Sequence, residues 1–368
     1  MMVTVSGYAK KDMYALFEKE LLEGNYENSC CTSVELVCSG NETFSYLSNV
    51  VNIVSTHLHV TNGKVLEEVW SCVQEIIALP SRGRLENSEF HRLLCKLVFY
   101  TMHMVCKKTV NLLLKGNSLD MNNELETYTY NETIIHKFGK YCKMSKYLLD
   151  NENYRRIHVL LYAVNKHNLK FVYFIVAKLV QLKELTTIPP VVYEQIEHIP
   201  LKSRQDIVWV LWDVLYRFVE AKGNRDIIYV VQCLFDLFII KYSKQTRVKR
   251  LNLLIRAFEV ATRNERLPYD HLDRSELAEV ASKNIAPLFN ELIISNERHE
   301  EHEHIVHDEK GVGISDESNY ESMVSFAMPK PRRKKRKSLG KKKPLQKSQV
   351  QEEEPMPIYL RVLPKVHS

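Results

Sequence analysis

The chain has 368 residues, 45% of them hydrophobic and 26% charged, which is enough apolar material for a sizeable folded core. Its formal net charge is +6, yet residues 329–347 alone hold eleven Lys and Arg and no acid, so the rest of the chain is net negative. Glycine (11) and proline (12) are scarce, and half of the prolines lie at or beyond Pro329. Because sheets need frequent tight turns built from such residues, the composition argues against a β-fold and favours long helices.

The N-terminal region, residues 1–118, is predicted to consist mainly of helices. Apolar residues recur there at intervals of three and four in segments 11–22, 41–59, 62–79 and 87–114. Between the first two of these lies a polar, cysteine-rich stretch, residues 24–40. We expect this stretch to be a loop with a short strand or turn.

Eight cysteines are scattered along the chain: Cys30, Cys31, Cys38, Cys72, Cys95, Cys106, Cys142 and Cys233. The stretch from Met1 to Lys11 lacks the apolar region of a secretory signal, so a reduced, intracellular compartment is expected, where buried thiols act as small hydrophobes. A zinc finger needs two ligand pairs, and the cluster at residues 30–38 has no second pair at finger spacing. No structural zinc is therefore predicted.

The polar stretch at residues 116–131 is the expected internal boundary, and a second helical domain is predicted over residues 132–296. Helical patterns in the first part of that domain occupy residues 133–149, 154–164, 169–182 and 191–197. Helix pairs recur about every forty residues from 152 to 262 without a repeated residue signature. A helical bundle and a short α-solenoid therefore both remain open.

Four further helices are predicted, the first three of them strongly apolar, over residues 207–221, 226–242, 246–263 and 274–294. Short loops between long helices favour antiparallel packing. Ser203 and Asp206 have the spacing of a capping box, which would start the first of these helices. That helix is apolar nearly all round and is expected to be central, with Trp209, Trp212 and Tyr216 in the core instead of forming a base-stacking platform.

The expected fold is all-α, a multi-helix bundle or short α-solenoid of about ten helices followed by a disordered charged C-terminal tail. No membrane span is predicted. The most apolar segment, residues 227–240, is about 14 residues long and contains Gln232 and Asp236, whereas a membrane helix needs about 20 apolar residues. This segment is interpreted as a buried core helix.

The tail is expected to be disordered because its charged blocks cannot bury enough apolar surface to offset the loss of chain entropy. Its three parts are an acidic linker rich in His and Glu, a basic segment and an end segment, at residues 297–328, 329–347 and 348–368. Four histidines in the linker alternate with carboxylates: His299, His302, His304 and His307. Flexible tracts of this kind bind metals weakly, so no specific metal site is predicted.

The basic segment is predicted to be a nuclear localisation signal, bound by the acidic grooves of a nuclear import receptor. Flanking prolines keep such a peptide extended and accessible. The residues assigned to this role are Lys330, Arg332, Arg333, Lys334, Lys335, Arg336, Lys337, Lys341, Lys342 and Lys343. The same run can bind nucleic-acid phosphates, in addition or instead, or can simply keep the protein soluble.

Two further features suggest contacts. Lys249, Arg256 and Arg263 recur every seven residues along the helix at 246–263 and can contact nucleic acid, although a solvated face is the default interpretation. Near the end of the chain, Ile358, Leu360 and Val362 alternate along one side of an extended segment. Such a segment is typical of a peptide that docks on a protein partner by adding a strand.

Catalytic motifs are missing from the sequence: it contains no P-loop, no dinucleotide-type glycine pattern, and no HExxH, GxSxG or CxxC. We therefore expect a non-enzymatic nuclear protein with no cofactor, a helical body that binds an unknown protein partner, and no membrane contact. A nucleic-acid-binding accessory factor in replication or transcription is the first alternative. An enzyme with an unrecognised helical active site is the second.

Overall fold

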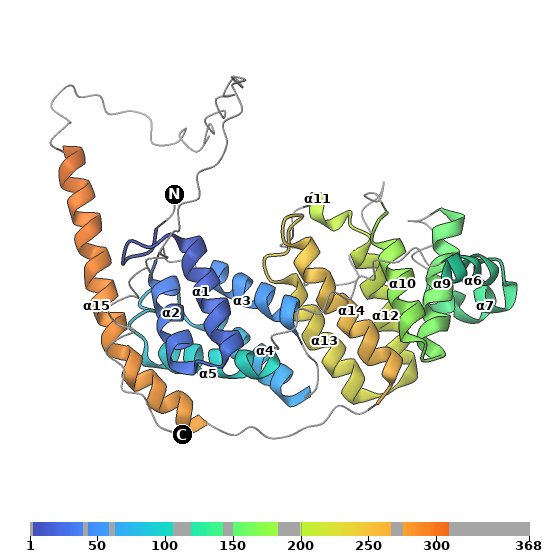
Figure 1. The fold of residues 1–368 in the computed structure, drawn as a ribbon, viewed down its shortest axis with the longest axis horizontal. Helices are drawn as coiled ribbons and strands as arrows, with labels where there is room; N and C mark the ends of the chain where they lie inside the picture. The colour runs from blue at the N-terminus through green and yellow to red at the C-terminus, as the bar shows by residue number, and fades with distance from the viewer. Residues whose placement is uncertain are drawn as a thin grey trace, which may run out of the picture. The chain divides into compact units, whose positions relative to one another are not determined.

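The computed structural model describes residues 3–39, 43–58, 63–105, 119–142, 150–182, 199, 201–265 and 275–308. Internal contacts divide the chain into two units, Met1–Asn296 and Glu297–Ser368. Every regular element in the described ranges is a helix, and two isolated bridges, Val3 with Ala9 and Leu58 with Val105, are the extended pairs found among them (Figure 1). The prediction of an all-α fold is therefore confirmed. No helix in the part described is long and apolar enough to cross a membrane.

The first unit begins with five helices: α1 (Lys10–Glu23), α2 (Tyr26–Cys38), α3 (Thr43–His57), α4 (Gly63–Ala78) and α5 (Ser88–Met104). The apolar stripes predicted at residues 41–59 and 62–79 form α3 and α4, which bury those stripes. α1 packs on α2, and α4 packs on α5. α5 ends at Met104, ten residues before the predicted end at 114, and residues 106–118 lie outside the described ranges.

The prediction of a loop at residues 24–40 is wrong, because α2 is a buried helix there. Its serine hydroxyl groups form hydrogen bonds to backbone carbonyls of the preceding turn: Ser29 donates to the carbonyl of Asn25 (2.8 Å), and Ser33 donates to the carbonyl of Ser29 (2.7 Å). Such bonds satisfy the hydroxyl groups without water, so a polar sequence can be buried. The seven cysteines in the described ranges, several of them on α2, are free and buried.

The middle of the unit contains α6 (Leu119–Thr129), α7 (Glu132–Phe138), the short 3₁₀ helix η1 (Gly139–Tyr141), α9 (Asn151–Asn165) and α10 (Leu169–Leu179). The polar stretch expected to be a boundary thus carries a helix, α6, which packs on α9 and buries Leu125. Asn168 lies in the gap between the helical patterns predicted at 154–164 and 169–182, and its Oδ1 accepts from the Phe171 amide (3.2 Å) as the N-cap of α10. The helix predicted at 191–197 lies outside the described residues.

The apolar block forms α11 (Leu201–Arg204), α12 (Val208–Lys222), α13 (Arg225–Ile239) and α14 (Arg247–Arg263). The capping box predicted at Ser203 is wrong, since Ser203 lies within α11 and α12 begins only at Val208. The Ser203 carbonyl accepts from Trp209 Nε1 (2.8 Å) instead, and Asp206 accepts from the Val208 amide (3.2 Å). A separate helical turn at α11 therefore occupies the position that the cap was expected to hold.

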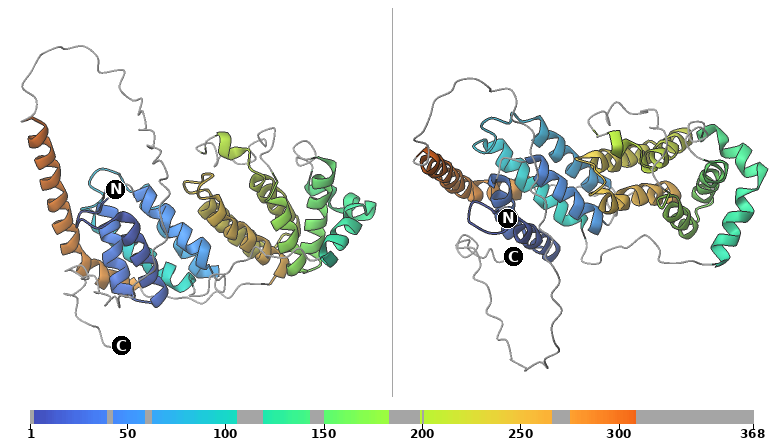
Figure 2. Two further views of the ribbon diagram at one scale, coloured as in Figure 1. Left: turned by 45° about the horizontal axis from the view of Figure 1, so that its top comes forward. Right: turned by 90° about the horizontal axis from the view of Figure 1, so that it is seen from above.

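The core of this block is aromatic. The Trp209 and Trp212 side chains are buried and meet the Phe238 ring edge-on, with centroids 5.6 and 5.4 Å apart, so their prediction as core residues is confirmed. α14 packs on α12 and α13 and also on α3, α9 and α10 (Figure 2). α14 thus connects helices that are distant in sequence, and both predicted helical regions lie within the unit Met1–Asn296. The division expected at 116–131 stays a prediction.

The last described element is α15 (Ser275–Asp308), which contains Pro287. Within the first unit, the Phe289 ring is buried and stacks on His91, with centroids 3.9 Å apart. The helix predicted to end at 294 continues to Asp308, and disorder of the tail stays a prediction. No glycine or proline interrupts the sequence there, and extending a helix costs far less than nucleating one. Residues 309–368 lie outside the described ranges.

Candidate functional site

The basic residues of α14 are positioned in three different ways. Arg250 is fully buried, and its guanidinium donates to the carbonyl oxygens of Leu237 (2.8 Å), Ile240 (3.0 Å) and Ser48 (3.1 Å). Burial lowers its pKa to about 9, so it remains protonated at neutral pH. Since Leu237 and Ile240 lie at the end of α13 and Ser48 lies on α3, this one cation ties the two helices to α14.

Arg256 is buried as well. It donates to the Leu58 carbonyl (2.9 Å) and pairs with Glu259, whose other oxygen accepts from Arg263 (2.5 Å). Lys249 is exposed, and Arg247 pairs with Asp206. The interpretation of the face formed by Lys249, Arg256 and Arg263 as solvated is therefore wrong for Arg256, because the Leu58 carbonyl offers an acceptor that the sequence pattern cannot reveal. Contact of Lys249, Arg256 and Arg263 with nucleic acid stays a prediction.

The other predicted site residues lie outside the described ranges. These are the import residues of the basic segment and the docking residues Ile358, Leu360 and Val362. The four histidines of the acidic linker fall on the last turns of α15, where the structure describes the backbone alone. The roles assigned to all of them from sequence stay predictions.

A groove of about 770 Å³ lies between α3, α4, α13 and the loop from α13 to α14. Its walls are mainly apolar, formed by Phe44, Trp70, Ile77, Ile239 and Ile240. This volume falls within the range of about 300–1,000 Å³ that is usual for ligand-binding clefts, which likewise combine apolar walls with a few polar groups. The groove is therefore the candidate functional site of the first unit.

Asp236 is the acidic group of the groove. Its Oδ1 accepts from Gln232 Nε2 (2.7 Å), and Gln232 Oε1 in turn accepts from the Tyr216 hydroxyl. No cation in the described residues pairs with Asp236, and desolvation raises the pKa of its carboxyl to about 6, although the bond from Gln232 opposes this shift. Asp236 therefore carries a charge at neutral pH in surroundings that disfavour it.

A second polar group in the groove lacks a partner. Asn52, on α3, is 9% exposed, and among the residues described its Oδ1 accepts no hydrogen bond. A buried acceptor left without a donor is costly, and such groups are rare in folded proteins. Asn52 and Asp236 are separated by more than 180 residues in sequence, so only the packing of α3 near α13 brings them to one groove. The presence of Asp236 in an apolar helix was the only sequence signal of this site.

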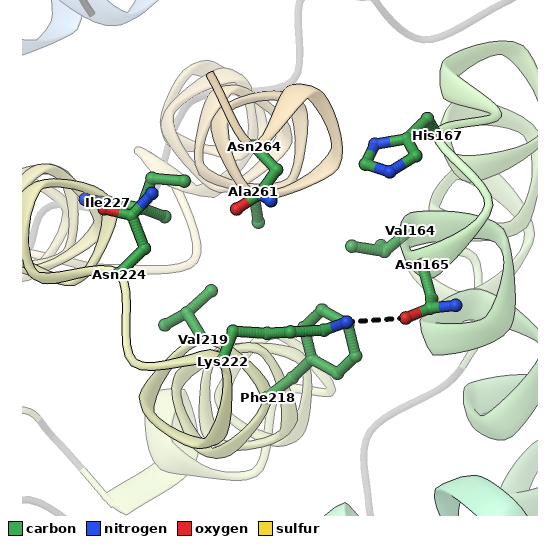
Figure 3. Close-up of a pocket in the computed structure, with 10 residues that line it drawn as sticks. All are labelled: Val164, Asn165, His167, Phe218, Val219, Lys222, Asn224, Ile227, Ala261 and Asn264. Atoms are coloured by element: carbon green, nitrogen blue, oxygen red, sulfur yellow. Dashed lines mark hydrogen bonds between the residues drawn. The ribbon is translucent and has the colours of Figure 1, made fainter. Parts of the chain in front are cut away.

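A second, smaller pocket lies where α9, α12 and α14 end and α13 begins (Figure 3). Its volume is about 40 Å³, and across it Lys222 Nζ donates to Asn165 Oδ1 (2.7 Å). His167 and Asn264, on its rim, adopt left-handed backbone conformations with φ of 58° and 51°. Such a pocket has room for a few water molecules and not for an organic ligand.

Comparison of the chain with known proteins finds no matching family, no similar curated protein and no similar solved structure. Any function assigned to it therefore depends on its own residues. The distinctive features of the larger groove are an apolar wall and two hydrogen-bond acceptors, Asp236 and Asn52. These features suit the binding of another molecule.

Proposed function

We propose that this chain is a non-enzymatic nuclear protein whose helical body binds a protein partner and whose basic segment binds a nuclear import receptor. The observation that carries the proposal is the segregation of charge. Residues 329–347 hold eleven Lys and Arg and no acid, whereas residues 1–296 have a net charge of only +3. A short basic run bounded by prolines is typical of a peptide that an import receptor recognises.

The helical body supports the partner-binding part of the proposal through two features. The apolar groove between α3, α4 and α13 offers a surface for contact. Arg250 and Arg256 tie α14 to the walls of that groove through carbonyl oxygens of α3, α13 and Leu58. A groove whose walls are held in this way loses little conformational freedom on binding, which favours affinity.

The test of nuclear import uses the full-length protein fused to a fluorescent reporter. The wild-type fusion should accumulate in the nucleus, and replacing the six basic residues at 332–337 by glutamine should leave it in the cytoplasm. Arg361→Gln combined with Lys365→Gln, which alters two cations outside the basic segment, serves as the control and should not change localisation. Nuclear accumulation of the glutamine variant, or cytoplasmic retention of the wild type, would contradict the proposal.

Binding to nucleic acid is the second candidate, favoured by the exposure of Lys249 and Arg263 on α14. The full-length protein should then bind duplex DNA with an affinity that falls as salt rises, by a logarithmic slope of about 0.9 for each phosphate contacted. Lys249→Glu combined with Arg263→Glu should reduce that slope if α14 makes the contact. An unchanged slope would assign any binding to the basic segment instead.

A further inference from the structure

We infer that the groove between α3, α4 and α13 binds an apolar segment of a partner protein that inserts a basic side chain, preferably arginine, between Asp236 and Asn52. The inference deepens the proposed function, since it rests on the helical body being the part that binds a partner. It names the chemistry that the partner must present. Its basis is an apolar wall, an exposed aromatic rim and two acceptor oxygens that have no protein partner among the described residues.

The apolar walls require an apolar occupant. Phe44, at the start of α3, is 43% exposed, and Trp70 on α4 also lines the groove. Aromatic side chains are enriched at protein interfaces, where they bury a large area with little loss of conformational entropy. An apolar face with side chains three and four residues apart, as on an amphipathic helix, would cover these rings.

The two acceptors require a donor with positive charge. Asp236 uses one carboxylate oxygen for the Gln232 amide, and its Oδ2 has no protein partner in the described residues. Asn52 also lines the groove, and its Oδ1 is buried and unpartnered among the described residues, so a donor that enters beside Asn52 would supply the missing hydrogen bond. Arginine carries five N–H donors in a rigid fork and no acceptor, so a single guanidinium can serve a carboxylate and a further oxygen.

The groove's own cation does not meet this need. Lys241 lines the groove, but its Nζ donates to Ser45 Oγ (2.8 Å), and Asp236 gains no stabilisation from it. The Tyr216 hydroxyl donates to Gln232 Oε1 and so orients the Gln232 amide with its nitrogen toward Asp236. The hydrogen-bond donor to Asp236 is therefore a neutral amide. The negative charge of Asp236 is therefore available to an incoming basic group.

A protein segment suits the groove better than a small molecule does. Small-molecule sites usually enclose about 70–90% of the ligand surface. Here Phe44 remains 43% exposed, so one side of the groove is open to solvent along an aromatic edge. An occupant bound there would keep an exposed outer face, as a segment of a larger protein does.

The test is the selection of random 16-residue peptides on the immobilised full-length protein, in parallel with Phe44→Asp, Asp236→Asn and the control Val248→Asp. Val248 is 66% exposed on α14 and does not line the groove, so this control adds the same charge elsewhere. Wild type and control should enrich peptides with apolar residues three and four apart and an Arg or Lys among them. Phe44→Asp should lose the enrichment, and Asp236→Asn should keep the apolar pattern but lose the basic residue.

The best selected peptide, labelled with fluorescein, then gives dissociation constants by anisotropy. Replacing its basic residue by glutamine should weaken binding to the wild type by about tenfold or more and should not weaken binding to Asp236→Asn. Circular dichroism of each variant shows that loss of binding is not loss of fold.

Three results would overturn the inference: no enrichment at all, enrichment without basic residues, or equal binding to Phe44→Asp. Saturable binding of an apolar dye that Phe44→Asp abolishes, without any peptide enrichment, would assign the groove to a small molecule. The reporter experiment tests the basic segment, whereas the peptide selection tests the groove. A failure of nuclear import would therefore not affect the conclusion from the peptide selection, and a failure of the peptide selection would not affect the conclusion about import.

Discussion

Replacing Asp236 by asparagine should stabilise the protein at neutral pH, although most substitutions destabilise. The cause is the desolvation that raises the pKa of this carboxyl from 3.8 to about 6. At about 1.4 kcal/mol for each pH unit, that shift corresponds to at most about 3 kcal/mol of lost stability above pH 6. Asparagine keeps an oxygen for the Gln232 amide and carries no charge, so we expect a gain of about 1–3 kcal/mol.

The dependence of this gain on pH is the stronger test. A carboxyl whose pKa is raised on folding contributes stability that is complete below the unfolded pKa, near 3.8, and is lost as the pH rises through the folded pKa, near 6. The advantage of Asp236→Asn should therefore be close to zero at pH 4, grow between pH 4 and 6, and level off above pH 7. Urea unfolding followed by circular dichroism at each pH measures it.

A matched control separates the local effect from the change in net charge. Asp226→Asn removes the same charge from the first turn of α13, outside the groove, where an acid favours the helix. It should be neutral or slightly destabilising. The reasoning is refuted if Asp236→Asn destabilises at pH 7, or if its effect is the same at pH 4 and pH 7.

Three further outcomes are expected. Arg250→Ala leaves three buried carbonyl oxygens without their donor and should lower the free energy of unfolding by about 3 kcal/mol or more. Lys249→Ala alters the neighbouring but exposed residue and should change the free energy of unfolding by less than about 0.5 kcal/mol. Equal effects of the two variants in urea unfolding would contradict the role assigned to Arg250. Burial raises the pKa of the Cys72 thiol from 9 to about 12, so the unfolded state loses its proton first and the stability of the fold falls as the pH rises above 9. Cys72→Ala should reduce the fall in stability between pH 9 and 10 by about 1 kcal/mol, and an unchanged fall would argue against a buried thiol. Asn168→Ala removes the N-cap of α10 and should cost about 1 kcal/mol by the same assay, with no loss counting against the cap.

The predicted gain from Asp236→Asn bears on function as well as stability. Groups that reduce stability without a structural benefit tend to mark functional sites, because selection retains them for another reason. If the same substitution stabilises the fold and removes the preference for basic peptides, stability and binding are in conflict at Asp236. That combination would identify the groove as a binding site more firmly than either measurement alone.

Several features of the fold follow directly from the sequence, because they depend on the spacing of apolar residues along one helix. α3, α4, α9, α12, α13 and α14 all occur where the helical periodicity predicts them, and Trp209 and Trp212 lie in the core that their apolar neighbours indicate. Few glycines and prolines excluded a sheet for the same local reason. α2 was not predicted because its sequence is polar. Its serine hydroxyl groups bond to backbone carbonyls one turn earlier, so this polar segment can form a buried helix.

The environment of each charged residue was decided only by the tertiary structure. Lys249, Arg250 and Arg256 are all basic residues of α14, yet Lys249 is exposed and the two arginines are buried, because the carbonyl oxygens that accept from the arginines belong to α3, to the end of α13 and to Leu58. The groove has the same origin, since Asn52 and Asp236 come from distant helices. Periodicity along one helix reports which face is apolar, but hydrogen-bond partners and cavities depend on which helices meet, and that is a property of the packed chain.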